Sequence, residues 1–162
     1  MGSGYTCTCN KCGFTFNAHV GVGFRYPAVY QETLKAARSG RLGKKARNFI
    51  TENPEGAINP KWVVARCEKC GQYESVPDLS MYIPKEGHPA SKNRGNWTGA
   101  SLDDENEYVS DFDTDYELKE TYDHKCRKCG GRMTIIGDEP QEHMPCPMCD
   151  GKMESEHTIF WD

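Results

Sequence analysis

The chain has 162 residues, enough for one ordinary domain or two small ones, and only 36% of them are hydrophobic. With a mean hydropathy of −0.78, this is little apolar material for a core, so a metal, disulfides or a partner is expected to stabilise the fold. No stretch approaches the roughly 20 apolar residues of a transmembrane helix, and a net charge of −4 gives no global electrostatic reason to expect nucleic acid.

The cysteines form a repeated pattern along the chain. Four Cys-x-x-Cys segments, here called knuckles one to four, are Cys9–Cys12, Cys67–Cys70, Cys126–Cys129 and Cys146–Cys149. The chain begins without a charged region followed by an apolar run, so we expect no secretory signal and a cytoplasmic location. In that compartment, paired cysteines indicate metal binding or redox chemistry rather than a disulfide framework.

A first module is expected over residues 1–84. Short strands are predicted on both sides of knuckle one, at 5–9 and 14–17, where Phe14, Thr15 and Phe16 are β-prone residues. Strands at 62–66 and 72–76 are predicted to flank knuckle two in the same way.

A helical insertion, at about 27–51, is predicted between these two knuckles. Pro27 suits a first helical position, and Ser39 followed by glycine suits a helix end. Further along, apolar residues recur at the spacing of one buried helix face: Leu42, Ala46, Phe49 and Ile50.

Residues 85–120 are expected to be a polar and acidic linker or surface loop. Between positions 103 and 120 the chain carries nine acidic residues and one basic residue, Lys119. A second module is expected over 121–162, with strands at 132–136 and 152–160. Three large apolar residues so near the end, Ile159, Phe160 and Trp161, predict a terminal segment that is packed.

The knuckles predict two four-cysteine zinc sites. A tetrahedral metal needs four ligands, and two cysteines separated by two residues can face one point because the chain turns tightly between them. Glycine follows the second cysteine in three knuckles and supplies the positive φ that such a turn needs. The predicted ligands of two Zn²⁺ ions are Cys9, Cys12, Cys67, Cys70, Cys126, Cys129, Cys146 and Cys149.

The pairing of the knuckles is predicted from their spacing. Sixteen residues lie between Cys129 and Cys146, as in zinc sites of this kind, so knuckles three and four are expected to form one site. Knuckles one and two would then form the other across the helical insertion. An interleaved pairing or an asymmetric cross-brace is the alternative, and Cys7, His124 and His143 are minor candidates for additional or replacement ligands.

Closed coordination by four thiolates leaves no position for a reacting water, so the predicted zinc ions are structural rather than catalytic. Iron in a rubredoxin-like site uses the same ligands, so iron is an alternative to zinc. Redox chemistry at the Cys-x-x-Cys pairs is an alternative to metal binding.

A basic stretch without any acidic residue follows the start of the helical insertion. It comprises Lys35, Arg38, Arg41, Lys44, Lys45 and Arg47. A solvated helix face is one interpretation, and contact with an anion or a nucleic acid is the other.

The knuckles, especially Pro145-Cys146-Pro147-Met148-Cys149, resemble those of zinc-ribbon and rubredoxin-like proteins. The whole chain is also similar to small zinc-ribbon proteins of bacteria, a resemblance that implies no activity. We therefore expect a small, β-rich α+β fold of two zinc-ribbon-like modules made of short antiparallel hairpins. Zinc ribbons generally bind protein or nucleic acid. Because the chain is acidic, the expected function is non-enzymatic binding of another protein. The alternative is binding of nucleic acid. Metal delivery or redox chemistry ranks below both.

Overall fold

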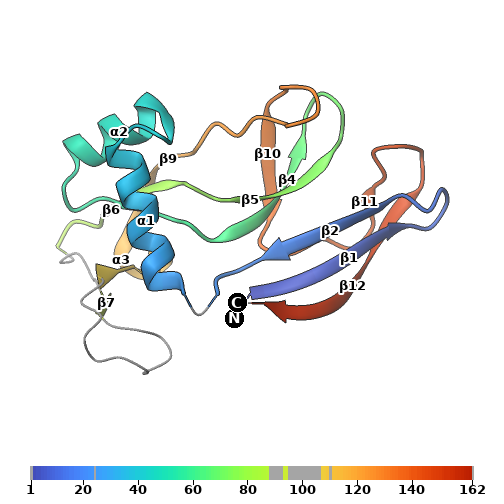
Figure 1. Cartoon of the computed structure of the whole chain (residues 1–162), viewed down its shortest axis with the longest axis horizontal. Coiled ribbons are helices and arrows are strands. Elements are labelled where there is room, and N and C mark those ends of the chain that lie inside the picture. The colour runs from blue at the N-terminus through green and yellow to red at the C-terminus, as the bar shows by residue number, and fades with distance from the viewer. Residues whose placement is uncertain (1, 24, 88–92, 95–106, 110, 162) are drawn as a thin grey trace. The chain divides into compact units, whose positions relative to one another are not determined.

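The computed structural model describes residues 2–23, 25–87, 93–94, 107–109 and 111–161 (Figure 1). The fold is β-rich α+β, and every paired strand in the described residues is antiparallel, which confirms the predicted fold class. Two compact units are present. The first comprises Met1–Gly23, Lys61–Asp78 and Asp123–Asp162, and the second comprises Phe24–Pro60 and Leu79–Tyr122. No helix in the described residues has the length and apolar character needed to span a membrane.

One sheet of the first unit joins the two ends of the sequence. It has the strand order β11 (Met144–Pro145), β12 (Lys152–Trp161), β1 (Gly2–Cys9) and β2 (Thr15–Val20). Figure 1 shows β1, in blue, beside β12, in red, and the two strands pair along all of β1. The backbone near the end of the sequence is therefore paired as expected, but the side chains of Ile159 and Phe160 are 50% and 67% exposed rather than packed.

A second sheet completes the first unit. It has the order β10 (Met133–Gly137), β4 (Trp62–Cys67) and β5 (Tyr73–Pro77). A buried cluster combines residues of both sheets: Cys7, Cys9, Ala18, Val20, Val64, Tyr73, Met144, Cys146 and Met153. The alternation of side chains along each strand thus gives each sheet one face for this core. All strands predicted beside the knuckles are present, and no bound differs from its prediction by more than three residues.

The second unit contains the helices. Its elements are α1 (Tyr26–Arg38), α2 (Gly43–Glu52), β3 (Ala57–Ile58), β6 (Met81–Pro84), β7 (Asn93–Arg94), β8 (Glu107–Tyr108), α3 (Phe112–Asp115) and β9 (Tyr116–Glu120). The predicted helical insertion is confirmed as the α1–α2 hairpin, with Pro27 near the start of α1 and Ala46, Phe49 and Ile50 buried. Strands β3, β6 and β9 form a three-stranded sheet.

The two units do not follow the expected boundaries of 1–84, 85–120 and 121–162. Part of the expected linker is folded, because β8, α3, β9 and the residue after β8 bury apolar side chains in the second unit: Tyr108, Val109, Phe112 and Tyr116. The hydroxyl of Tyr26 in α1 donates to the carbonyl oxygen of Val109 at 2.7 Å. The remainder of that linker, residues 88–92, 95–106 and 110, lies outside the described residues. All nine cysteines belong to the first unit, so aromatic and aliphatic packing stabilises the second unit without any thiol.

Candidate metal centres

The structure gathers the eight knuckle cysteines into two groups of four. One group, here called site A, consists of Cys9, Cys12, Cys146 and Cys149; the other, site B, consists of Cys67, Cys70, Cys126 and Cys129. Within each group the sulfur atoms all lie within 4.8 Å of one another, so either group could hold a metal ion. Both sites belong to the first unit.

The predicted pairing of the knuckles is wrong. Knuckle one meets knuckle four, and knuckle two meets knuckle three, so the sites are nested along the chain rather than sequential, and they are also not interleaved. Strand pairing is the cause. β1 leads into knuckle one and pairs with β12, which follows knuckle four, while β4 leads into knuckle two and pairs with β10, which follows knuckle three. Each antiparallel pair therefore brings two distant knuckles to the same end of a sheet.

The distances between sulfur atoms fit a tetrahedral metal. With metal–sulfur bonds of about 2.3 Å, the corners of a tetrahedron lie about 3.8 Å apart. In site A, Sγ of Cys9 is 3.6 Å from Sγ of Cys149, and Sγ of Cys12 is 3.7 Å from Sγ of Cys146. In site B, the pairs Cys67–Cys129 and Cys70–Cys126 are separated by 3.4 and 3.7 Å. The four donors thus already occupy approximately the positions that a metal of this geometry requires.

The turn of each knuckle orients its sulfur atoms. Gly13, Gly71 and Gly130 have φ values of 72°, 72° and 67°, as predicted from the glycine that follows each of these knuckles. The turns direct backbone N–H groups at the thiols: in site A the N–H of Lys11 lies 3.4 Å from Sγ of Cys9, and in site B the N–H of Cys70 lies 3.4 Å from Sγ of Cys67. Such contacts hold a ligand in position and favour its thiolate form.

The thiols within each site differ in how readily they ionise. The N–H of Cys12 is the main cause that lowers the pKa of Cys9 to about 6, and the N–H of Cys70 does the same for Cys67, also to about 6. In the same site as Cys67, the pKa of Cys129 is raised to about 12. Its hydrogen bond from Gly131 lowers that pKa, but the neighbouring sulfurs of Cys67 and Cys70 outweigh it. Four thiolates at these distances repel one another, so full ionisation requires a bound metal cation.

The minor candidate ligands lie outside both groups. Cys7 is fully buried in the core, and burial raises the pKa of its thiol to about 11, as expected for a packed apolar residue. His124 is buried, with its Nε2 atom 2.9 Å from the carbonyl oxygen of Asp78. Neither His124 nor His143 belongs to a metal-binding group among the described residues.

The basic residues predicted as an anion contact lie on the α1–α2 hairpin of the second unit. The side chains of all six are exposed: Lys35, Arg38, Arg41, Lys44, Lys45 and Arg47. Lys45 is engaged within the unit, because its Nζ donates to the carbonyl oxygen of Thr121 at 2.8 Å and lies 3.5 Å from the carboxylate of Glu120. The hairpin is therefore a positively charged surface, which we call the basic hairpin.

Comparisons with protein-family models, curated proteins and solved structures find no match to this chain. The two four-cysteine groups are consistent with zinc-ribbon-like sites.

Proposed function

We propose that the protein is a non-enzymatic protein-binding or adaptor module whose first unit is held together by two structural Zn²⁺ ions. The observation that carries the proposal is that the protein supplies all four ligands at each site. Each consists of four thiols from two knuckles at tetrahedral spacing, which leaves no position for a substrate or a reacting water on the metal.

Zinc is the metal that this donor set favours. Four thiolates in a tetrahedron suit zinc, which has no geometric preference of its own, and they also suit iron in a rubredoxin-like site. Sites A and B both belong to the first unit, whose apolar core is small. This supports a stabilising role for the metal.

Binding of a protein is supported by the surface of the first unit. Ile159 and Phe160 expose large apolar side chains on β12, and each could contact a partner protein. The chain is acidic as a whole, with a net charge of −4, which disfavours a generic nucleic-acid partner.

Metal analysis of the purified chain tests the proposal. We expect two zinc ions per chain by elemental analysis. After cobalt substitution, we expect the spectrum of tetrahedral thiolate coordination at both sites, together with slow metal exchange. One metal per chain, rapid exchange or a stable disulfide within a knuckle would contradict a structural role and support metal delivery or redox chemistry.

A second candidate function rests on the basic hairpin. Lys44 occupies the first turn of α2, where the positive end of the helix dipole makes a cation unfavourable, so helix stability does not explain its placement. The charge of Lys44 would attract the phosphates of a nucleic acid.

Salt dependence of binding to a DNA duplex tests this second function. We expect affinity to fall steeply with salt if the hairpin binds phosphates, and Lys44→Glu to weaken binding. Lys119→Glu is the matched control, because Lys119 is an exposed cation of the same unit that lies outside the hairpin. Salt-insensitive binding, or equal losses in the two variants, would exclude the hairpin as a nucleic-acid contact.

A further inference from the structure

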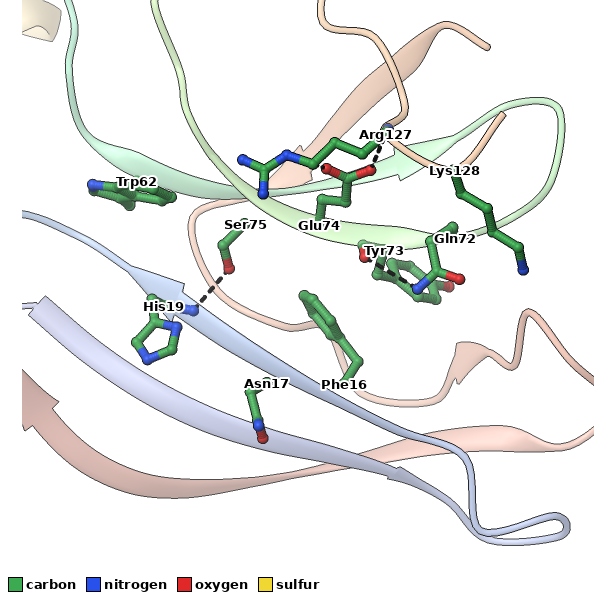
Figure 2. Close-up of a pocket in the computed structure, with 10 residues that line it drawn as sticks. All are labelled: Phe16, Asn17, His19, Trp62, Gln72, Tyr73, Glu74, Ser75, Arg127 and Lys128. Atoms are coloured by element: carbon green, nitrogen blue, oxygen red, sulfur yellow. Dashed lines mark hydrogen bonds and ion pairs between the residues drawn. The ribbon is translucent and has the colours of Figure 1, made fainter. Parts of the chain in front are cut away.

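Two sheet edges of the first unit face each other and are joined. β2 and β5 each end the order of their sheet, and a groove of about 600 Å³ lies along them, lined from β2, from β4 and β5 with the turn between them, and from knuckle three. Across the groove the N–H of His19 donates to the hydroxyl of Ser75 at 2.8 Å, as Figure 2 shows. Gly21 and Trp62 exchange backbone bonds of 2.8 and 2.9 Å. These two edges therefore leave no room for a further strand.

The outer edge of β12 is open by contrast. β11 pairs with β12 only at Lys152 and Met153, and no strand in the described residues pairs with the outer side of Glu154–Phe160. His143, directly before β11, has a φ of 59° and lies in a turn, so the ladder begins only at Met144. All side chains of Glu154–Phe160 are exposed. An exposed edge of this kind is a template for pairing with another chain.

The backbone of this edge alternates between bonded and outward groups. The N–H of Asn10 donates to the carbonyl oxygen of Lys152 at 3.0 Å, and the N–H of Lys152 donates to Oδ1 of Asn10 at 3.2 Å, so the backbone of Lys152 faces β1. Because alternate residues of an antiparallel strand direct their N–H and C=O groups to opposite sides, every second residue after Lys152 also faces β1. The groups of Ser155 and His157 then point outward, where an extended chain can bind them.

One face of this edge carries aromatic rings. His157 lies edge-to-face with Tyr5 at a centroid distance of 5.3 Å, and its ring contacts that of Phe160 at 4.6 Å. Strict alternation would put His157 and Phe160 on opposite faces. The register with β1 skips Thr158, and this bulge brings the two rings to the same face. The edge therefore offers an exposed apolar surface beside its outward backbone groups.

The charges along the edge are acidic. Glu154 and Glu156 lie on the face of β12 opposite to His157, and neither forms an ion pair within the residues that the structure describes. On the aromatic face, the carboxylate of Glu139 lies near Tyr5, whose pKa is raised mainly by burial and further by this charge. A basic extended segment therefore complements the edge on both faces.

We propose that the open edge of β12, from Glu154 to Phe160, binds a basic extended segment of a partner protein, whose backbone pairs with Ser155 and His157. Lysine or arginine side chains of the segment lie opposite Glu154 and Glu156. The apolar side chains that alternate with them pack against His157 and Phe160. The proposal rests on the protein-binding function given above and specifies its site and its partner chemistry.

A second copy of the chain fits this edge less well. Antiparallel pairing of Ser155 with Ser155 of another copy would place Glu154 opposite Glu156, and pairing of Ser155 with His157 would place two Glu156 side chains opposite each other. Like charges directly opposite destabilise a strand pair. The same carboxylates repel the phosphates of a nucleic-acid strand.

The test uses the zinc-loaded full chain labelled with ¹⁵N and a capped peptide of alternating valine and lysine, seven residues long. We expect concentration-dependent shifts of the amide signals of Ser155 and His157. Hydrogen exchange at these two amides should also slow, because the peptide supplies acceptors to N–H groups that point outward in the free chain. A peptide with glutamate in place of lysine should bind roughly ten-fold more weakly, since it brings like charges together.

Charge reversal on β12 supplies one matched comparison. Glu156→Lys should weaken binding of the lysine peptide roughly ten-fold. Glu32→Lys makes the same change in net charge at an exposed residue of α1 in the second unit, and it should leave binding unchanged. Equal effects of the two variants would overturn the role of the carboxylates on β12.

Proline substitution separates backbone pairing from charge. Ser155→Pro removes an N–H that points outward, so it should weaken peptide binding roughly ten-fold. It should keep two zinc ions per chain, because proline is tolerated on an edge strand whose N–H faces solvent. Ser155→Ala keeps the N–H and should bind like the unmodified chain. Equal affinities of the two Ser155 variants would overturn strand pairing.

Three other outcomes would overturn the edge assignment. The first is the absence of shifts at both amides with the lysine peptide. The second is self-association of the chain without peptide that shifts the same amides, which would assign the edge to a second copy. The third is a thymidine oligonucleotide that shifts the two amides when the peptide does not, which would assign the edge to nucleic acid. The proposed function fails separately, on metal content and exchange.

Discussion

A Cβ atom at residue 151 would lie 2.7 Å from Sγ of Cys9, although Gly151 and Cys9 stand near opposite ends of the sequence. The same relationship occurs in site B, where a Cβ at Gly131 would lie 3.0 Å from Sγ of Cys67. Each of these glycines follows one knuckle and touches a thiol of the other. Glycine is therefore required here for the close approach of two knuckles, whereas Gly13 and Gly71 are required for the conformation of the turn.

Gly151→Ala should abolish metal binding at site A. The added methyl group meets Sγ of Cys9 and Cβ of Lys11 at 2.7 and 2.8 Å, distances that force the knuckles apart. Gly13→Ala is the matched control, because its Cβ has open space and its cost is the strain of a positive φ, about 1–2 kcal/mol. We expect one zinc per chain for Gly151→Ala and two for Gly13→Ala. Two zinc ions in both variants would show that the knuckles can separate without loss of the metal.

Cys9→Ser and Cys129→Ser should reveal the nested pairing of the knuckles. In the amide spectrum of Cys9→Ser, signals of Cys146 and Cys149 should move, whereas signals of Cys67 and Cys70 should stay in place, because the latter belong to site B. Cys129→Ser should give the reverse pattern. If Cys9→Ser instead disturbed knuckle two, the sequential pairing that the spacing predicts would be restored.

Removal of zinc by a chelator should unfold the first unit and spare much of the second. Structural zinc contributes about 10–16 kcal/mol in finger peptides, comparable with or larger than the roughly 5–15 kcal/mol stability of a whole domain. The second unit has no cysteine, so α1 and α2 should keep slow amide exchange after chelation. Loss of that protection together with the metal would show that the two units unfold cooperatively.

Alkaline pH should destabilise the second unit through Tyr26 and Tyr30. Burial is the main cause that raises the pKa of both phenols above the ordinary value of 10.0. Because the folded state retains these protons longer than the unfolded chain, their contribution is complete below about pH 10 and is lost as the pH rises further. Chemical unfolding measured along an alkaline pH series checks the prediction.

Tyr26→Phe isolates one of these phenols. It should reduce the loss of stability above pH 10, and it should cost about 1–3 kcal/mol at neutral pH, since the carbonyl oxygen of Val109 loses its donor. An unchanged alkaline profile in this variant would assign the pH dependence to other groups.

Local signals predicted the local structure well. The β-prone residues around the knuckles, the proline at the start of α1 and the apolar period of α2 each correspond to an observed element. The eight cysteines that group in the structure are the eight that the spacing selects. These features depend on interactions within a few residues, which a sequence displays directly.

Partner choice among distant segments was not predictable in the same way. The 16-residue gap between Cys129 and Cys146 suits a single site, but β12 pairs with β1 and carries knuckle four to knuckle one. Likewise, the acidic residues around β9 suggested a linker, although Phe112 and Tyr116 supply enough apolar surface to fold that segment. The groove was also missed, because its edges come from three separate parts of the chain.

The pairing of β1 with β12 has a consequence for synthesis of the protein. Cys9 leaves the ribosome 140 residues before Cys149, the thiol that lies beside it in site A. At about 5–20 residues per second, its thiol waits roughly 7 to 28 seconds for that partner. Site B is completed earlier, because both of its knuckles precede Cys146. Nascent chains are therefore expected to capture their first metal ion at the inner site and to expose reactive thiols of knuckle one until knuckle four has been synthesised.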